Sequence, residues 1–176
     1  MTIDTVPRLR ARPLLVLTAA LLIAGLAGQA LAQADDISFQ VEIFRVDLVR
    51  GDDGEIGERF VSVEEAIPGE VIEYRVTAVN EGDIIYRPGT VVVTLPIGDG
   101  VAYLEGSATP SSERVVTEFS ADGGTTFSEP PVLIAGDDGE GERAAEPAEY
   151  DTIRWTFQVP FEPGQEEQLV YRVEVL

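Results

Sequence analysis

Short runs in which apolar and polar residues alternate make up most of the chain after residue 34. The clearest run is VIEYRVTAVN at residues 71–80, where Ile72, Tyr74, Val76 and Ala78 share one parity. Side chains of one parity lie on one face of a strand, so this pattern is typical of an antiparallel strand with one buried face. No stretch after residue 34 has a convincing helical period. The chain is therefore predicted to be all-β.

Turn signals divide the remaining alternating runs into short strands. Asp122-Gly123-Gly124 predicts a hairpin turn, because adjacent glycines supply the positive φ angles that such turns need. Pro163-Gly164 separates two alternating runs and predicts a final hairpin. The further strands are expected within residues 37–48, 60–63, 90–95, 103–104, 115–119, 132–134, 153–159 and 169–175. We expect about eight or nine strands in a single Ig-like antiparallel β-sandwich that spans residues 35–176.

The first of these strands changes the parity of its apolar residues. Ile43 ends a series of odd-numbered apolar positions, whereas Val46 and Leu48 are even-numbered. A shift of one residue turns side chains to the other face, so we expect a bulge, or a crossing between two sheets, near Phe44 and Arg45.

Three large aromatic residues share the apolar parity of their strands and are predicted to lie in the core. These residues are Tyr74, Trp155 and Tyr171. An exposed position that stacks on a sugar is the alternative for Trp155.

Residues 1–34 have the three-part pattern of a secretory signal peptide. Arginines precede an uncharged apolar run at residues 14–27, and small residues follow, with Ala32-Gln33-Ala34 as the expected cleavage site. The apolar run is shorter than the ~20 residues of a membrane-spanning helix, so an uncleaved anchor is the lesser alternative. The mature chain is therefore expected to be exported, to the periplasm or to the cell exterior.

Composition excludes several kinds of chemistry. The net charge is −20, all twelve basic residues are arginine, and histidine, cysteine and lysine are absent. The chain therefore has no imidazole base, no thiolate nucleophile, no lysine-based covalent catalysis and no disulfide. Its negative charge repels phosphate backbones and anionic lipid headgroups, which disfavours nucleic acid and direct membrane binding.

The sequence GDDGE occurs twice, at residues 51–55 and 136–140. Adjacent aspartates lack the alternating ligand spacing of an EF-hand loop, and Asp-Gly pairs favour turns, so two solvated turns are the preferred interpretation. No cofactor is expected, but weak extracellular calcium sites bind at ~10⁻⁴–10⁻³ M, which keeps calcium as the alternative. The candidate ligands are Asp52, Asp53, Glu55 and Glu58 in the first cluster, and Asp137, Asp138, Glu140 and Glu142 in the second.

Paired acids can also hydrolyse a glycosidic bond when two carboxyl groups flank it in a cleft. Here the alternating strands put acidic residues on the polar, outward-facing parity. No catalytic residue is therefore predicted, and the chain is expected not to be an enzyme.

Five segments occur in an order that resembles a known bacterial family. The segments are PGEVIEYRVTAVNEGD, VVVTLPIGDGVAYLEGSATP, FSADGGTTFSEPP, YDTIRWTF and PGQEEQLVYRVEV. Together they resemble the conserved-repeat β-sandwich called domain of unknown function eleven, over about residues 37–176. Two features depart from the family: Val93 stands where many members have aspartate, and the chain holds one copy where many members hold several.

The resemblance implies an Ig-like domain of bacterial surface and exported proteins, with no established catalytic residues. We therefore expect a non-enzymatic structural or binding module of the cell envelope, with an unidentified envelope or surface protein as its partner. The alternative is a domain that recognises a protein or a glycan, with or without calcium. Recognition would then use an exposed sheet edge or the loop at residues 136–149.

Overall fold

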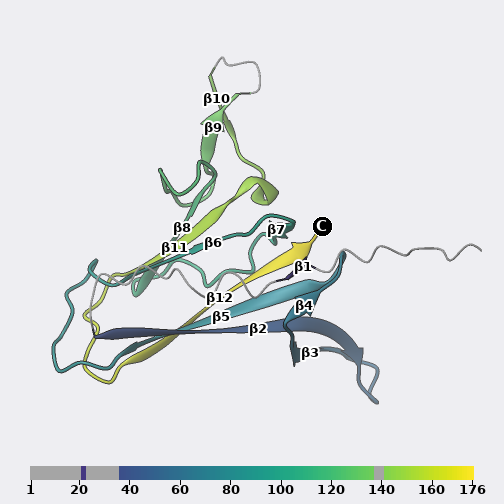
Figure 1. The fold of residues 1–176 in the computed structure, drawn as a ribbon, viewed down its shortest axis with the longest axis horizontal. Helices are drawn as coiled ribbons and strands as arrows, with labels where there is room; N and C mark the ends of the chain where they lie inside the picture. The colour runs from purple at the N-terminus through teal and green to yellow at the C-terminus, as the bar shows by residue number, and fades with distance from the viewer. Residues whose placement is uncertain (1–20, 23–35, 137–140) are drawn as a thin grey trace, which may run out of the picture.

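The structure is a computed structural model that describes residues 21–22, 36–136 and 141–176 (Figure 1). Its secondary structure is almost entirely strand. The elements are β1 (Leu21–Leu22), β2 (Ile37–Arg50), β3 (Ile56–Ser62), β4 (Glu65–Ala66), β5 (Val71–Asn80), β6 (Val92–Pro96), β7 (Val101–Tyr103), β8 (Val115–Ser120), β9 (Leu133–Ala135), β10 (Glu142–Ala144), the 3₁₀ helix η2 (Pro147–Glu149), β11 (Thr152–Phe157) and β12 (Glu166–Val175).

Two antiparallel sheets form the body of the protein. One has the strand order β3-β2-β5-β12-β7 and the other β6-β11-β8. The predicted all-β, antiparallel sandwich is confirmed. From Ile37 onward the described residues form eleven strands, rather than the expected eight or nine, because β4 and β10, which have two and three residues, were not predicted. Strands this short leave no alternation to detect.

The core lies between the sheets and is built on aromatic rings. Trp155 on β11 is fully buried, and Tyr74 and Tyr171 are 6% and 2% exposed. The two tyrosines stack across β5 and β12 with ring centroids 4.8 Å apart, and Trp155 lies 5.9 Å from Tyr171. Burial of each large apolar side chain contributes roughly 1.5–3 kcal/mol. The predicted core positions are confirmed, and the sugar-stacking alternative for Trp155 is wrong.

The predicted final hairpin is wrong. β11 pairs with β6 and β8, whereas β12 pairs with β5 and β7 in the opposite sheet. The connection between them crosses the sandwich and buries Phe161, which bridges to Tyr86 through two backbone hydrogen bonds of 3.0 and 3.1 Å. Both strands alternate because both inner faces meet the same core. Alternation reports which face is buried and not which strand is the neighbour.

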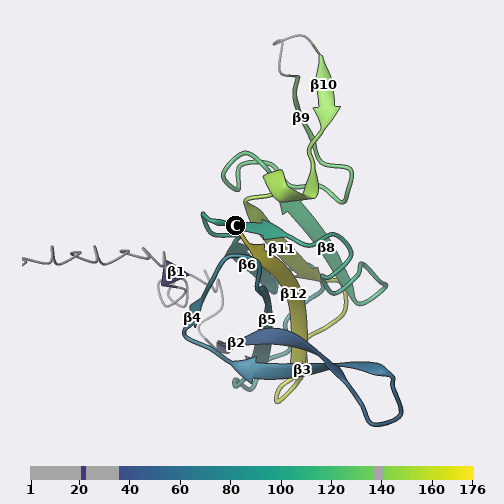
Figure 2. The same ribbon diagram turned by 90° about the vertical axis from the view of Figure 1, so that its right-hand side faces the viewer.

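The bulge or sheet crossing expected near Phe44 and Arg45 is also absent, because β2 runs without a break in register and pairs with β3 and β5 of one sheet. Residues 37–45 pair with β5, and residues 44–50 pair with β3 on the other side. Beyond Arg45 the strand leaves the sandwich as a two-stranded ribbon with β3 (Figure 2). The even-numbered apolar residues Val46 and Leu48 therefore lie on the outer face.

Asn80 is a fully buried polar residue at the end of β5. Its side-chain amide donates hydrogen bonds to the carbonyls of Ile84 (2.9 Å) and Phe161 (3.0 Å), and its side-chain oxygen accepts one from the Gly82 N–H (3.1 Å). A buried polar group is stable only when it is paired in this way. Asn80 thus anchors both the turn after β5 and the connection between the sheets.

The chain reverses at residues 122–124 as predicted, but the reversal leads to a single bridge at Ser128 and not to a second strand of a hairpin; the strand partner of β8 is β11. Gly123 and Gly124 have φ angles of 75° and 79°, which favour glycine. The turn is closed by two backbone hydrogen bonds of 2.9 and 3.1 Å between Phe119 and Ser128.

In the segment 136–149, the described residues 141–149 do not form a plain loop, contrary to expectation. β10 pairs with β9 in a small hairpin that projects from the sandwich (Figures 1 and 2), and η2 follows it. Ala145, which joins the hairpin to η2, is 6% exposed and belongs to the core. Residues rich in glycine, alanine and acid carry too weak a period to predict strands of three residues.

Of the predicted signal peptide, only Leu21–Leu22 is described, as β1 paired with β4. The basic residues, the cleavage site and the rest of the apolar run lie outside the described residues. In the part of the chain that is described, we find no helix with the length and apolar character needed to cross a membrane.

Candidate functional site

The first predicted calcium cluster is a turn at the tip of the β2–β3 ribbon. Backbone hydrogen bonds join the Gly51 N–H to the Glu55 carbonyl (2.8 Å) and the Gly54 N–H to the Gly51 carbonyl (3.0 Å). The Asp53 carboxylate accepts a hydrogen bond from the Glu55 N–H at 3.1 Å, and Asp52 is exposed. The GDDGE sequence at residues 51–55 therefore forms a solvated turn in which one carboxylate is used locally.

Glu58, the fourth candidate of that cluster, lies away from the turn and is bound to arginine. Each of its carboxylate oxygens accepts a hydrogen bond of 2.7 Å from a terminal nitrogen of Arg172 on β12. The Arg172 guanidinium lowers the pKa of Glu58, and the pair raises the pKa of Arg172. Glu58 is thus part of an ion-pair network and not grouped with Asp52 and Asp53.

The second predicted cluster is only partly described. Asp137, Asp138 and Glu140 lie outside the described residues, and Glu142 is an exposed residue of β10 opposite Ala135. In the described ranges, 36–136 and 141–176, no three acidic side chains are close enough together to hold a metal ion.

The outer face of the five-stranded sheet carries a network of arginines, carboxylates and aromatic rings. Glu73, 5% exposed, accepts hydrogen bonds from the Nε atoms of Arg75 (2.6 Å) and Arg172 (2.8 Å). The Arg75 guanidinium lies 4.6 Å from the centroid of Phe44 and 4.3 Å from that of Phe60. Such cation–π contacts contribute about 0.5–1 kcal/mol at partly exposed sites. The network stabilises Glu73 as a buried carboxylate.

The other face of the ribbon is held by a second ion-pair group. Asp47 accepts hydrogen bonds from Arg45 and Arg59, each at 2.8 Å, and Arg45 also donates to Glu70 at 3.2 Å. The hydrogen bonds from Arg45 and Arg59 lower the pKa of Asp47. Both faces of the ribbon are therefore ordered by arginine–carboxylate pairs.

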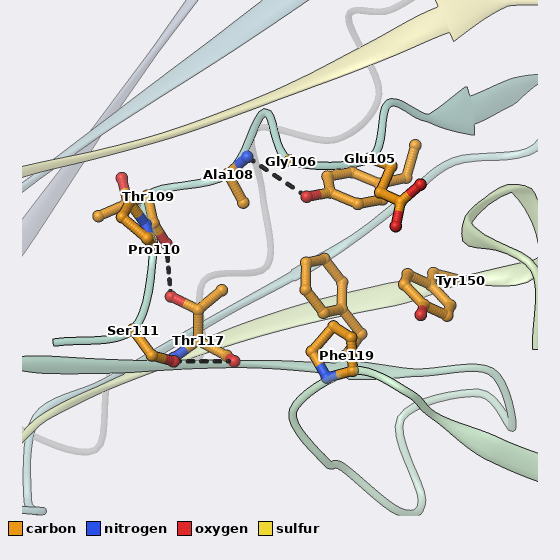
Figure 3. Close-up of a pocket in the computed structure, with 11 residues that line it drawn as sticks. Glu105, Gly106, Ala108, Thr109, Pro110, Ser111, Thr117, Phe119 and Tyr150 are labelled. Carbon is orange, nitrogen blue, oxygen red and sulfur yellow. Dashed lines mark hydrogen bonds between the residues drawn. The ribbon is translucent and has the colours of Figure 1, made fainter. Parts of the chain in front are cut away.

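A hollow of about 290 Å³ is lined by residues of β7 and β8, the edge strands of the two sheets, and of the segment that follows β7 (Figure 3). Its wall includes the rings of Tyr103, Phe119 and Tyr150, whose centroids are 4.7 to 5.9 Å apart. The segment that contains Pro110 and Ser111 forms the facing side in Figure 3.

Most polar groups of the hollow are already bonded within the protein. The Tyr103 hydroxyl accepts a hydrogen bond from the Ala108 N–H (3.3 Å), and the Thr117 hydroxyl donates to the Thr109 carbonyl (2.6 Å). Burial raises the pKa of Tyr103, and hydrogen bonds such as the one from Ala108 offset only part of that rise, so the phenol stays neutral. Glu105 is the one acidic residue of the lining. A hollow with one carboxylate lacks the acid pair of a glycosidase.

The Asp122 turn is a compact hydrogen-bonded structure. The Asp122 carboxylate accepts hydrogen bonds from the Thr126 N–H (2.9 Å), the Thr126 hydroxyl (2.7 Å) and the Ser120 hydroxyl (2.8 Å). These bonds lower its pKa to about 2, with the Thr126 backbone as the largest cause. The carboxylate is occupied by the turn itself, which gives it a structural role.

The change of parity along β2 is the sequence signal for the outer-face network, although it was interpreted as a bulge or a sheet crossing. Phe44, Val46 and Leu48 take the parity opposite to the core residues of β2, and Phe60 has the same orientation on β3. The pattern marked a second, outward-facing apolar surface on an unbroken strand. The partners of Arg172, by contrast, come from β3 and β5 and have no local signal.

Comparisons of this chain with protein-family models, with curated proteins and with solved structures gave no match.

Proposed function

We propose that the chain is a non-enzymatic module of the bacterial cell envelope that is exported and serves a structural or binding role. The observation that carries the proposal is the use of its charged residues. Three carboxylates form ion pairs with arginines that hold the sheet together: Glu58, Glu73 and Asp47. A fourth, Asp122, accepts a backbone hydrogen bond that closes its turn. Carboxylates committed in this way stabilise a domain and are poorly suited to transfer protons.

Two features of the sequence support the same proposal. Residues 1–34 have the pattern of a secretory signal, and residues 37–176 resemble an Ig-like domain of exported proteins. A fold alone does not imply a function, so the export signal and the disposition of the acids support the proposal more than the sandwich does.

The second candidate function is recognition of a protein or a glycan, assisted by calcium or not. The observation that favours it is the exposed β2–β3 ribbon, where Leu48 is 72% and Ile56 is 63% exposed. Exposed apolar residues gathered on one surface are typical of interaction sites.

Export is tested by expressing the full chain in a bacterium and fractionating the cells. We expect the protein in the periplasm or medium, with a new N-terminus close to residue 35. A chain that lacks residues 1–34 is the matched control and should stay in the cytoplasm. Retention of the full chain in the cytoplasm, or uncleaved insertion in the membrane, would contradict the proposal.

A further inference from the structure

The free edge of β3 presents a row of unpaired backbone groups. The Val63 N–H donates to the Ile43 carbonyl at 3.3 Å, in the same register as the β2–β3 pairing. Hydrogen-bonded pairs alternate along an antiparallel ladder, so the odd-numbered residues of β3 bond to β2. The N–H and C=O groups of Ile56, Glu58 and Phe60 therefore point away from the sheet. β3 ends the strand order and has β2 as its one neighbour among the described strands.

The other edges of the two larger sheets are shorter or covered. β7 has three residues and lies beside η2, and β6 has five and ends in Pro96. The outer edge of β8 is bonded at Thr117 by the Ser111 side chain and at Phe119 by Ser128. β3 has seven residues, no proline and no bulge. An edge without such protection is a template for another strand.

The side chains beside this edge form an apolar surface. Ile56 and Phe60 are 63% and 37% exposed on the outer face of β3, and Leu48 on β2 lies between them and is 72% exposed. Gly57 leaves open space on the other face. A strand added to β3 would place every second side chain over this apolar surface.

The charge near the edge selects the partner. Residues 50–60 carry four carboxylates and two arginines, in a chain with a net charge of −20. A second copy would bring the same charge and be repelled. Glu58 lies between Ile56 and Phe60 on the edge. Each carboxylate oxygen of Glu58 accepts one hydrogen bond from Arg172, which leaves part of its acceptor capacity unused. A cationic side chain opposite Glu58 would find a remaining acceptor.

We infer that the β3 edge binds an extended segment of another protein by strand addition. The segment has the pattern apolar–any–basic–any–apolar, with the basic residue opposite Glu58 and the apolar residues opposite Ile56 and Phe60. The inference rests on the proposed binding role and specifies its surface. The bound segment would lie outside the sandwich core, and its binding would require no metal.

The test uses the purified protein and a synthetic peptide of seven residues with blocked ends, Thr-Val-Thr-Arg-Thr-Val-Thr. We expect NMR to show slower amide exchange at Ile56, Glu58 and Phe60 on binding, with smaller changes at Gly57 and Arg59, whose N–H groups already bond to β2. A peptide with glutamate in place of arginine should bind at least tenfold more weakly. Binding should also weaken as salt rises from 0.1 M to 1 M, because the Debye length falls from about 10 Å to 3 Å.

Backbone methylation gives a matched pair of peptides. N-methyl groups on the valine and arginine residues block the N–H groups that face β3 and should abolish binding. N-methyl groups on the threonines block only the outward-facing N–H groups and should leave binding largely intact. On the protein, Phe60→Pro removes an edge-facing donor and should abolish binding, and Phe60→Ala should weaken it. Leu133→Ser, which changes an exposed leucine of β9, is the control.

Three results would overturn the inference. These are no binding of the arginine peptide at millimolar concentration, binding that the two methylated peptides share equally, and a stable dimer through β3 in sedimentation. The last result would make a second copy the occupant. None of them bears on export, so loss of this inference leaves the proposed function standing, whereas a cytoplasmic protein that binds the peptide would contradict the proposed function alone.

Discussion

Arg172 on β12 binds both carboxylate oxygens of Glu58 on β3, with two hydrogen bonds of 2.7 Å. Two strands, β2 and β5, separate β3 from β12 in the sheet. The same guanidinium donates through Nε to Glu73 at 2.8 Å. One arginine near the end of the chain therefore links the edge strand to a buried carboxylate in the middle of the sheet.

The two partners of Arg172 differ in burial, so their loss should differ in cost. We expect Glu58→Gln to lower the free energy of unfolding by about 1 kcal/mol or less, as for an exposed pair. Arg172→Gln should cost ~2–4 kcal/mol, because it leaves Glu73 buried with Arg75 as its remaining arginine. Urea unfolding of both single variants and the double variant gives the coupling energy. Equal costs for the two single variants would contradict this account of the network.

Replacing Asn80 should destabilise the protein because three hydrogen bonds end on its side chain. Asn80→Ala leaves buried backbone groups unpaired, at about 1–3 kcal/mol for each group that water cannot reach. Asn80→Asp should be worse, since a carboxylate cannot donate to the carbonyls of Ile84 and Phe161. The control is Gln158→Ala, which removes an exposed amide and should stay within about 0.5 kcal/mol. Chemical denaturation measures the free energy of unfolding of the three variants. An Asn80→Ala variant as stable as the Gln158→Ala control would contradict the anchoring role.

Trp155 is the single tryptophan of the chain, so fluorescence reports its environment. We expect blue-shifted emission and poor quenching by acrylamide, because the side chain is fully buried. Trp155→Ala should cost ~3–5 kcal/mol through the cavity that it leaves. Trp155→Phe should cost less, because the ring is partly retained and the buried indole Nε1 has no hydrogen-bond partner among the described residues. Emission typical of an exposed indole would contradict the core position.

The Asp122 turn should contribute a pH-dependent part of the stability. The folded pKa is about 2, below the ordinary value of 3.8. A lowered pKa stabilises the folded state fully above the unfolded pKa, and this stabilisation is lost as the pH falls from about 4 through 2. The difference in unfolding midpoint between wild type and Asp122→Asn should shrink over that range. Asp52→Asn controls for the loss of one negative charge, and an NMR titration of Asp122 with a midpoint near 4 would contradict the prediction.

Calcium should have little effect on the first GDDGE turn. Asp53 already accepts a local hydrogen bond, and Glu58 is bound to Arg172. We therefore expect no change in the melting midpoint between millimolar calcium and excess chelator, a concentration range that would occupy a weak site. If calcium raises the melting midpoint and Asp52→Asn or Asp53→Asn removes this rise, calcium binds at this turn. A rise in the melting midpoint that only Glu142→Gln removes would indicate binding at the second cluster.

Several parts of the fold could be predicted because they depend on one residue at a time. The inward parity of Tyr74, Trp155 and Tyr171 follows from the preference of large apolar groups for burial. The turn at Gly123 follows from a positive φ angle that glycine tolerates. The ion-pair network of the candidate site was harder to predict, because Glu58 and Arg172 are 114 residues apart. Neither residue has a local sequence feature that indicates its partner.

The polarity pattern was enough to predict the all-β class, the buried face of β5, β11 and β12, and the position of the main turns. Which strands are neighbours, the placement of β11 and β12 in opposite sheets, and the open edge of β3 became visible in the three-dimensional fold. This difference arises because burial is a preference of a single side chain and follows from its polarity and its spacing along the strand. Strand pairing and ion pairing are properties of two distant segments, and many partners satisfy the same alternation until packing selects one.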